Sequence, residues 1–257
     1  MRRAAALAFG VVSYAVFFAT FLYLVGFLAN LVVPKSIDSG PAGPVGFAIL
    51  VNTLLLLLFG VQHSVMARPA FKDWWTRFVP EPIERSVYTL ASSLAFVALF
   101  VLWQPIPQTV WATEGVIASL LRIGMLSGVG LVLFSTFLID HFDLFGLRQT
   151  WLYFRGRPYQ EKRFATPLLY KHVRHPLYVG WLMTFWITPV MSAGHFLFAL
   201  VMTSYILVAI PMEENDLARA LGEPYRRWRA RTPLFVPRVR VAAARPVEPG
   251  PRVAESR

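Results

Sequence analysis

Four long apolar segments constrain this chain more than any other feature of its sequence. They run roughly over residues Ala4–Val33, Val45–Met66, Val87–Trp103 and Val116–Ile139. A helix needs about 20 consecutive apolar residues to cross the hydrocarbon core of a bilayer. The whole chain of 257 residues, with 56% hydrophobic residues and a mean hydropathy of +0.52, is also more apolar than an ordinary soluble domain. The sequence therefore predicts an all-α integral membrane protein.

A fifth apolar region, Leu177–Pro211, is too long for one helix. Pro189 and Gly194 interrupt it, which predicts a helix-turn-helix hairpin with two short arms. Pro176 directly precedes the region, and proline is tolerated at the first helical position because its missing N–H would have no partner there. The first arm should therefore begin at Pro176. We expect four transmembrane helices plus this hairpin, and hence five or six spans with cytosolic loops.

Basic residues are distributed unequally among the connections between these segments. The connections over 67–86 and 140–176 are rich in Lys and Arg, whereas the first connection has only Lys35 and the third has neither residue type. Because cytoplasmic loops are enriched in Lys and Arg, both termini and these two basic segments are predicted to be cytoplasmic. Topology and lipid headgroups then account for the net charge of +11, and nucleic-acid binding is not expected.

Ionisable side chains near the membrane collect in four places on the predicted cytoplasmic side. They end the second span, end the fourth span, precede the hairpin and follow it. The members, in that order, are His63; Asp140 and His141; Lys171, His172, Arg174 and His175; and Glu213, Glu214 and Asp216. Such groups are costly next to hydrocarbon. Four groups at one depth predict a single cavity that faces the cytoplasm.

Each group also has a structural explanation. His63 could interact with the C-terminal carbonyls of its own helix, and Asp140 with His141 could form an interfacial cap. A metal site is not expected. The closest pair of possible ligands is His172 and His175, but a residue before a proline is pushed out of helical geometry, so the two would not share a helical face. The chain also has no cysteine.

The start and the end of the predicted hairpin carry opposite charge. Arg174 and His175 lie in the cap region of the first arm, where free N–H groups and the helix dipole favour an anion. The planar guanidinium of Arg174 matches a carboxylate. Glu213 and Glu214 supply negative charge after the second arm. Such a hairpin suits a zwitterionic ligand, such as an amino acid.

The motif YKHVRHPLYVG, an apolar hairpin and then EENDLARALGEPYRRWRARTPLFVP together resemble the C-terminal signature of the isoprenylcysteine carboxyl methyltransferase superfamily. The resemblance implies a membrane methyltransferase that uses S-adenosyl-L-methionine. It also implies which residues bind this cofactor, because eight positions match the pattern. They are Arg174, His175, Pro176, Tyr178, Gly180, Glu213, Glu214 and Tyr225.

Three further stretches, FLYLVGFLANLVVPKSIDSG, VQHSVMARPAFK and FDLFGLRQTWLYFRGRPY, are similar to bacterial methanethiol S-methyltransferases and their NnrU-like relatives. This branch implies methylation of a small thiol, methanethiol, to dimethyl sulfide, with membrane lipid as the surroundings and a bacterial inner membrane as the location. Residues 1–139 would form an N-terminal transmembrane bundle with the thiol pocket. Residues 140–238 would be the cofactor-binding region with the hairpin, and 239–257 a disordered tail.

The chemistry of such a reaction points to a general base, because the thiolate and not the thiol is the nucleophile. The candidate catalytic residues are His141, His63 and Asp140, the last of which could orient a histidine or accept the proton itself. A methyltransferase of the same superfamily with another small acceptor is an alternative. A transporter is disfavoured because the polar residues lie on one side only. In a haem-linked redox protein, His63 and His141 would be the ligands.

Overall fold

The computed structural model describes residues 1–160 and 164–237. Within these residues, five helices are long and apolar enough to cross a membrane. They are α1 (Arg2–Ala29), α2 (Val45–Ala67), α4 (Glu81–Leu102), α5 (Gly115–Ile139) and α9 (Ala193–Leu221). The first four match the predicted apolar segments to within a turn or two, and the prediction of an all-α integral membrane protein is confirmed. The tail predicted over 239–257 lies outside the described residues.

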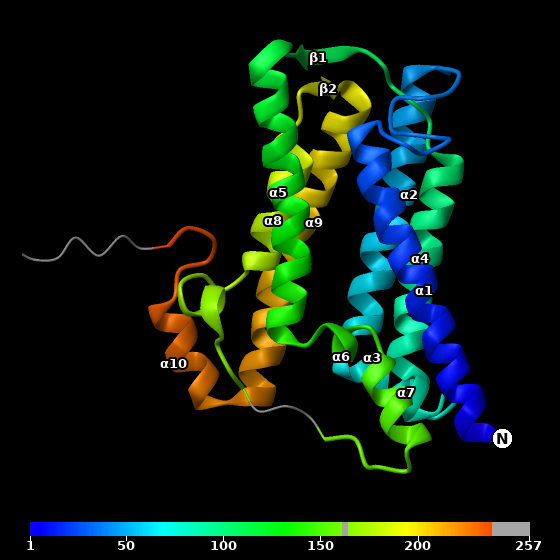
Figure 1. Cartoon of the computed structure of the whole chain (residues 1–257), viewed down its shortest axis with the longest axis vertical. Coiled ribbons are helices and arrows are strands. Elements are labelled where there is room, and N and C mark those ends of the chain that lie inside the picture. Colours follow the sequence, from blue (N-terminus) through cyan, green and yellow to red (C-terminus); the bar gives the residue numbers. More distant parts are fainter. Residues whose placement is uncertain (161–163, 238–257) are drawn as a thin grey trace, which may run out of the picture.

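The long helices form two groups that lie side by side (Figure 1). In one group α1 and α2 both pack against α4, and in the other α5 and α9 both pack against the short helix α8 (Pro176–Trp186). Contacts between α2 and α9 join the two groups. The bundle therefore consists of two groups of helices. Residues of α2 and α4 from one group can contact residues of α8 and α9 from the other where the groups adjoin.

The two ends of the bundle differ in structure (Figure 1). The N-terminus and several short helices gather at one end, which we call the α10 end, and a two-stranded antiparallel sheet lies at the opposite end, which we call the β end. The short helices are α3 (Pro69–Trp75), α6 (His141–Leu144), α7 (Leu147–Phe154), the 3-10 helix η1 (Leu168–Lys171) and α10 (Glu223–Arg231), and the strands are β1 (Thr109–Ala112) and β2 (Val190–Ser192). At the β end the Ser192 hydroxyl donates to the Asp38 carboxylate, which ties the first connection to β2.

The predicted hairpin is present, but its two arms are unequal. Helix α8 begins at Pro176, as predicted, and has 11 residues. The returning helix α9 has 29 residues and continues through Pro211, so the prediction of two short arms is wrong. A proline removes one hydrogen bond from a helix, and here the buried neighbours Ile210 and Glu214 keep the helix packed on both sides of it. Glu213 and Glu214 consequently lie within α9 and not after it.

Helices α5 and α8 approach most closely at two glycines. A Cβ atom at Gly128 would lie 2.8 Å from the carbonyl oxygen of Gly180, and a Cβ atom at Gly180 would lie 2.8 Å from that of Gly128. Small residues allow this close backbone contact between membrane helices. Helix packing therefore accounts for a glycine at position 180, which the sequence assigned to the cofactor-binding motif.

Candidate functional site

The carboxylate of Glu214 joins three parts of the chain. It is only 3% exposed, accepts a hydrogen bond from Arg174 Nη1 at 2.6 Å and forms an ion pair with Arg229 Nε at 2.9 Å. His175 Nε2 lies 3.0 Å from the same carboxylate. Arg174 and His175 precede α8, whereas Arg229 belongs to α10. The cationic start of the hairpin and its acidic pair therefore lie together, and charge-assisted hydrogen bonds of this kind stabilise a buried carboxylate.

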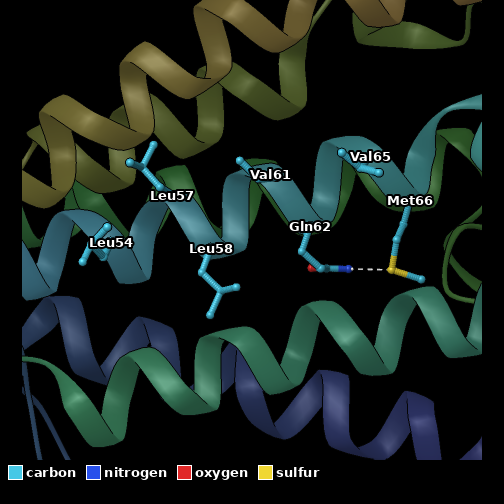
Figure 2. Close-up of a pocket in the computed structure, with 7 residues that line it drawn as sticks. All are labelled: Leu54, Leu57, Leu58, Val61, Gln62, Val65 and Met66. Atoms are coloured by element: carbon cyan, nitrogen blue, oxygen red, sulfur yellow. Dashed lines mark hydrogen bonds between the residues drawn. The ribbon is translucent and has the colours of Figure 1, made fainter.

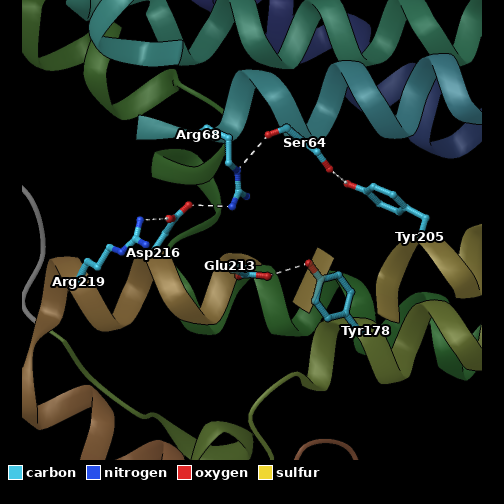
Figure 3. A network of polar contacts seen from close by, with 7 residues as sticks. All are labelled: Ser64, Arg68, Tyr178, Tyr205, Glu213, Asp216 and Arg219. Carbon is cyan, nitrogen blue, oxygen red and sulfur yellow. Dashed lines mark hydrogen bonds and ion pairs between the residues drawn. The ribbon is translucent and has the colours of Figure 1, made fainter. Parts of the chain in front are cut away.

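The neighbouring acid, Glu213, has different surroundings (Figure 3). Its Oε2 accepts a hydrogen bond from the Tyr178 hydroxyl at 2.8 Å. The phenols of Tyr88 and Tyr205 also lie close enough to interact electrostatically with this carboxylate. In the described part of the chain Glu213 makes this single hydrogen bond, and a carboxylate can accept several. Glu213 therefore retains the acceptor capacity that Glu214 has already used.

Arg174 has one N–H group that is buried and without a partner. Its Nη1 binds Glu214, but no hydrogen-bond acceptor among the described residues reaches its Nε. The backbone N–H groups of Arg174 and His175 donate to the carbonyls of Pro233 and Leu234, at 2.9 and 3.2 Å, so the segment after α10 covers the start of α8. An unpaired buried donor costs about 1–3 kcal/mol. An anionic group bound here would remove that cost.

Tyr225 lies behind Glu214 and is buried. Its ring packs against Phe164 and Trp228, with ring centroids 5.7 and 5.4 Å apart. Burial, and secondarily the Glu214 carboxylate, raise the pKa of Tyr225 to about 12. The phenol therefore stays neutral at physiological pH, and its position supports the packing of α10 beside Glu214.

His63 lies beside the same group of tyrosines. The Tyr88 hydroxyl is 2.8 Å from its Nε2 and 3.1 Å from its Nδ1, and the Ser92 hydroxyl is 3.1 Å from Nδ1. Its ring packs on Phe59 at a centroid distance of 5.1 Å. Because Tyr88 also interacts with the Glu213 carboxylate, His63 is linked to the hairpin residues through Tyr88.

Contacts between α2 and α9 hold this region together (Figure 3). Arg68 Nη1 forms an ion pair with Asp216 at 2.7 Å, and the Ser64 hydroxyl donates to the Tyr205 hydroxyl at 3.3 Å. A Cβ atom at Gly60 would lie 3.0 Å from the Tyr205 ring, so the glycine leaves the space that this ring occupies. The tyrosines around Glu213 are thus fixed from both helix groups.

His141 lies in a different cluster, at the junction of α1, α5 and α6. Its side chain is 2% exposed and stacks on Phe137 at a centroid distance of 4.3 Å. Nδ1 is 2.8 Å from Thr136 Oγ1, and Nε2 is 2.8 Å from the Tyr14 hydroxyl. The Thr136 hydroxyl donates to the Leu133 carbonyl, so it accepts from Nδ1–H, and Nε2 accepts from Tyr14.

The surroundings of His141 therefore occupy both of its ring nitrogens. Within the described residues, no hydrogen bond or ring contact joins His141 to His63 or to Glu213. Burial lowers the pKa of His141, and the nearby Asp140 carboxylate opposes part of this effect. The structure thus separates two histidines that the sequence placed in one cavity.

Asp140 performs the capping role that was the alternative to catalysis. Its side chain accepts a hydrogen bond from the backbone N–H of Asp143 at 3.3 Å, at the start of the short helix α6. Asp143 in turn forms an ion pair with Arg148 at 2.9 Å. An aspartate that accepts from the backbone at this position is a common helix N-cap, and here it fixes the turn that carries His141.

An apolar groove on α2 is distinct from this site (Figure 2). Several of its side chains are among the most exposed apolar residues of the helix. The seven lining residues are Leu54, Leu57, Leu58, Val61, Gln62, Val65 and Met66. All of them belong to one helix, and such a surface suits lipid acyl chains.

The sequence did not identify several residues that connect the polar side chains of different helices. Tyr88 and Tyr205 lie inside apolar spans, and Arg68 was assigned only to the basic loops. Arg229 belonged to a basic stretch without an individual role. A hydroxyl inside an apolar span is the only local signal for the two tyrosines, because such a group needs a partner when it is buried.

Comparison with curated proteins finds relatives that match along nearly the whole chain. Methanethiol S-methyltransferase 2 of Bradyrhizobium diazoefficiens is 55% identical over 238 residues, which is 92% of each chain. Methanethiol S-methyltransferase of Crocosphaera subtropica is 47% identical over 92% of this chain and 93% of its own. The enzyme of the same name from Mycobacterium tuberculosis is 47% identical over 92% of this chain and 98% of its own. No protein-family model and no solved structure matches the chain.

Proposed function

The chain belongs to the methanethiol S-methyltransferase family, and from this premise we propose that it transfers a methyl group from S-adenosylmethionine to methanethiol, with dimethyl sulfide as the product. The observation that carries the proposal is an identity of 55% over 92% of the chain. The membership agrees with the resemblance of the RHPLYVG motif and the acidic pair to the isoprenylcysteine carboxyl methyltransferase superfamily.

The start of α8 and the middle of α9 are the proposed binding site for the methionine end of the cofactor. Arg174 would hold the carboxylate through its unpaired Nε, and Glu213 would hold the ammonium. Glu214 would orient the Arg174 guanidinium through its ion pair, and His175 would hold the Glu214 carboxylate in place. Pro176 sets where α8 begins. When bound there, S-adenosylmethionine supplies a methyl group on a positively charged sulfur.

Tyr178, Gly180 and Tyr225 are proposed to act on this site through their packing. Tyr178 donates to Glu213 and thereby orients the carboxylate that would receive the ammonium. Gly180 fixes α8 against α5, and Tyr225 supports α10 behind Glu214. A loss of any of the three would disturb the geometry of Arg174 and Glu213.

His63 is the proposed general base. A thiol must lose its proton before its sulfur becomes a good nucleophile. The assignment is supported by Tyr88, which contacts His63 and interacts electrostatically with Glu213. His141 and Asp140 are assigned to positioning, because their polar atoms serve the Tyr14, Thr136 and helix-cap contacts.

The α10 end is proposed to face the cytoplasm of a bacterial inner membrane. Several of its connections carry Lys and Arg, as cytoplasmic loops do. A charged, water-soluble cofactor would reach Arg174 and Glu213 from this side. Methanethiol and dimethyl sulfide are small and apolar when neutral, so both would be able to pass through the surrounding lipid.

The direct test is the production of dimethyl sulfide by the purified protein from methanethiol and S-adenosylmethionine, measured by gas chromatography of the headspace. No product from a folded protein that binds the cofactor would overturn the proposed reaction.

A matched pair of variants tests the cofactor site. Glu213→Gln should weaken cofactor binding about 10- to 100-fold, the value of a charged hydrogen bond, while the melting temperature stays close to that of the wild type. Glu214→Gln should instead lower the melting temperature, because it leaves Arg174 and Arg229 without their buried carboxylate. Isothermal calorimetry and thermal unfolding in detergent distinguish the two. Equal cofactor affinity in Glu213→Gln and the wild type would remove Glu213 from the site.

A further inference from the structure

We propose that Tyr88 is a catalytic residue that relays the proton of the bound thiol to His63. The proposal rests on the proposed methyl transfer, because it specifies how the acceptor thiol is activated. It starts from a single hydroxyl group in α4, which contacts His63 at 2.8 Å and lies close enough to Glu213 to interact with it electrostatically.

The shortest contact of His63 is between its Nε2 and the Tyr88 hydroxyl, at 2.8 Å. Its Nδ1 lies 3.1 Å from the hydroxyls of both Ser92 and Tyr88. When Nδ1–H donates to Ser92, the lone pair of Nε2 accepts the Tyr88 O–H. The Tyr88 oxygen then keeps its own lone pairs for a second donor. A thiol S–H would be that donor.

His63 needs an intermediate group to receive a proton from a thiol bound near Glu213. Within the described residues, neither a hydrogen bond nor a ring contact joins His63 directly to Glu213, Tyr178 or Tyr205. The Tyr88 phenol, in contrast, interacts electrostatically with both Glu213 and Tyr205. Tyr88 therefore lies near both His63 and the group of residues at which the methyl donor is proposed to bind.

The relay balances without any further reactant. The S–H bond of the thiol breaks as an O–H bond forms on Tyr88, and the original O–H bond of Tyr88 breaks as an N–H bond forms at His63 Nε2. Tyr88 ends as it began, His63 becomes an imidazolium, and the sulfur is left as a thiolate that can accept the methyl group. Transfer of this proton from His63 to water restores the neutral imidazole and completes the cycle.

The test compares two acceptors of nearly the same shape, methanethiol and methaneselenol, since a selenol is already ionised at neutral pH. Tyr88→Phe should reduce kcat for methanethiol at pH 7 by about 100-fold or more, as expected for the loss of proton transfer. The same variant should methylate methaneselenol at nearly the wild-type rate, and its rate with methanethiol should rise with pH as the thiol ionises in solution. Cofactor binding, measured by calorimetry, should not change.

Tyr23→Phe is the matched control, because its hydroxyl binds the Lys35 carbonyl away from the site and its loss should leave both rates unchanged. A Tyr88→Phe variant that loses both acceptors equally, or that keeps full activity with methanethiol, overturns the relay. If Tyr88→Phe does not fold, His63→Gln must show the same selective rescue by the selenol. A wild-type protein that methylates neither acceptor would overturn the proposed function itself, which separates the two failures.

Discussion

His63 and His141 have similar places in the sequence and different places in the structure. Each lies at the end of an apolar span. His63 contacts Tyr88, which also interacts electrostatically with Glu213 on another helix. His141 is held between Thr136 and Tyr14, and its ring stacks on Phe137. His63 is connected through Tyr88 to the polar residues around Glu213, whereas both ring nitrogens of His141 are occupied by hydrogen bonds to its neighbours.

A histidine at a membrane boundary is therefore not a catalytic or binding site in itself. Its chemistry depends on whether the side chains around it have already used their hydrogen-bonding capacity. Thr136 donates to its own helix and Tyr14 completes the set around His141, which is a closed arrangement. Tyr88 contacts His63, and its oxygen keeps acceptor capacity. Substitutions of the two histidines should therefore have different effects.

Substitution of His63 should have the largest effect on turnover. His63→Ala should lower kcat with methanethiol by about 100- to 10,000-fold, the range for loss of a general base, while cofactor binding is retained. Initial rates of dimethyl sulfide formation and calorimetry with S-adenosylhomocysteine measure the two quantities. A comparable loss of turnover in folded His141→Ala, with His63→Ala active, would reverse the assignment.

Substitution of His141 should affect stability more than chemistry. His141→Ala removes a buried ring with two hydrogen bonds and leaves Thr136 and Tyr14 without their partner. We expect a loss of about 2–4 kcal/mol in the free energy of unfolding. Thermal unfolding in detergent measures it, with kcat per folded molecule expected within a few-fold of the wild type. An unchanged melting temperature would contradict the structural role.

Removal of one hydroxyl from the His141 cluster should have a smaller effect. Tyr14→Phe deletes the donor to His141 Nε2 but keeps the ring that packs against Phe17 and Phe142. The expected loss is about 1 kcal/mol, the usual net value of one hydrogen bond. The matched variant Tyr23→Phe removes an equivalent hydroxyl outside the cluster. If the losses in the free energy of unfolding from Tyr14→Phe and His141→Ala are additive in the double variant, the two residues do not interact.

The pH dependence of stability should be the smallest effect, and it depends on His141. Burial lowers its pKa in the folded protein below the ordinary value of 6.5. The unfolded state then binds more protons below pH 6.5, so the contribution of His141 is present above that pH and decreases as pH falls toward the folded pKa. Melting temperatures of the wild type between pH 8 and pH 5 should decline more steeply than those of His141→Gln. Parallel curves would contradict the prediction.

Much of the fold could be predicted because its main signals are local. Apolar runs of span length located the first four long helices, and a proline after a polar cluster located the start of α8 at Pro176. The end of the hairpin was mispredicted at Pro211 because the interactions that carry a helix past a proline come from other segments. Whether a buried side chain such as Glu214 finds three partners is decided by tertiary packing.

Part of the spatial arrangement was predictable from the sequence. The hairpin brings Arg174 and His175 to Glu214, as expected, whereas their role in cofactor binding stays a prediction. The sequence did not distinguish Glu213 from Glu214, because adjacent helical residues point in different directions and their partners lie on separate helices. It could not find Tyr88, since nothing in the linear order of the chain connects α4 with α9.

The short helix α8 has a consequence for how the protein is built. Its 11 residues rise only about 16 Å, too little for a helix to enter a bilayer as an independent span. In the described part of the chain, five other helices are long and apolar enough to cross a membrane. Helix α8 must instead reach its place by docking on α5, where Gly128 and Gly180 meet. The start of α8, with Arg174 and His175, is therefore set in place only after both neighbouring spans have been inserted, so the ability to bind a ligand there arises in the last stage of biogenesis.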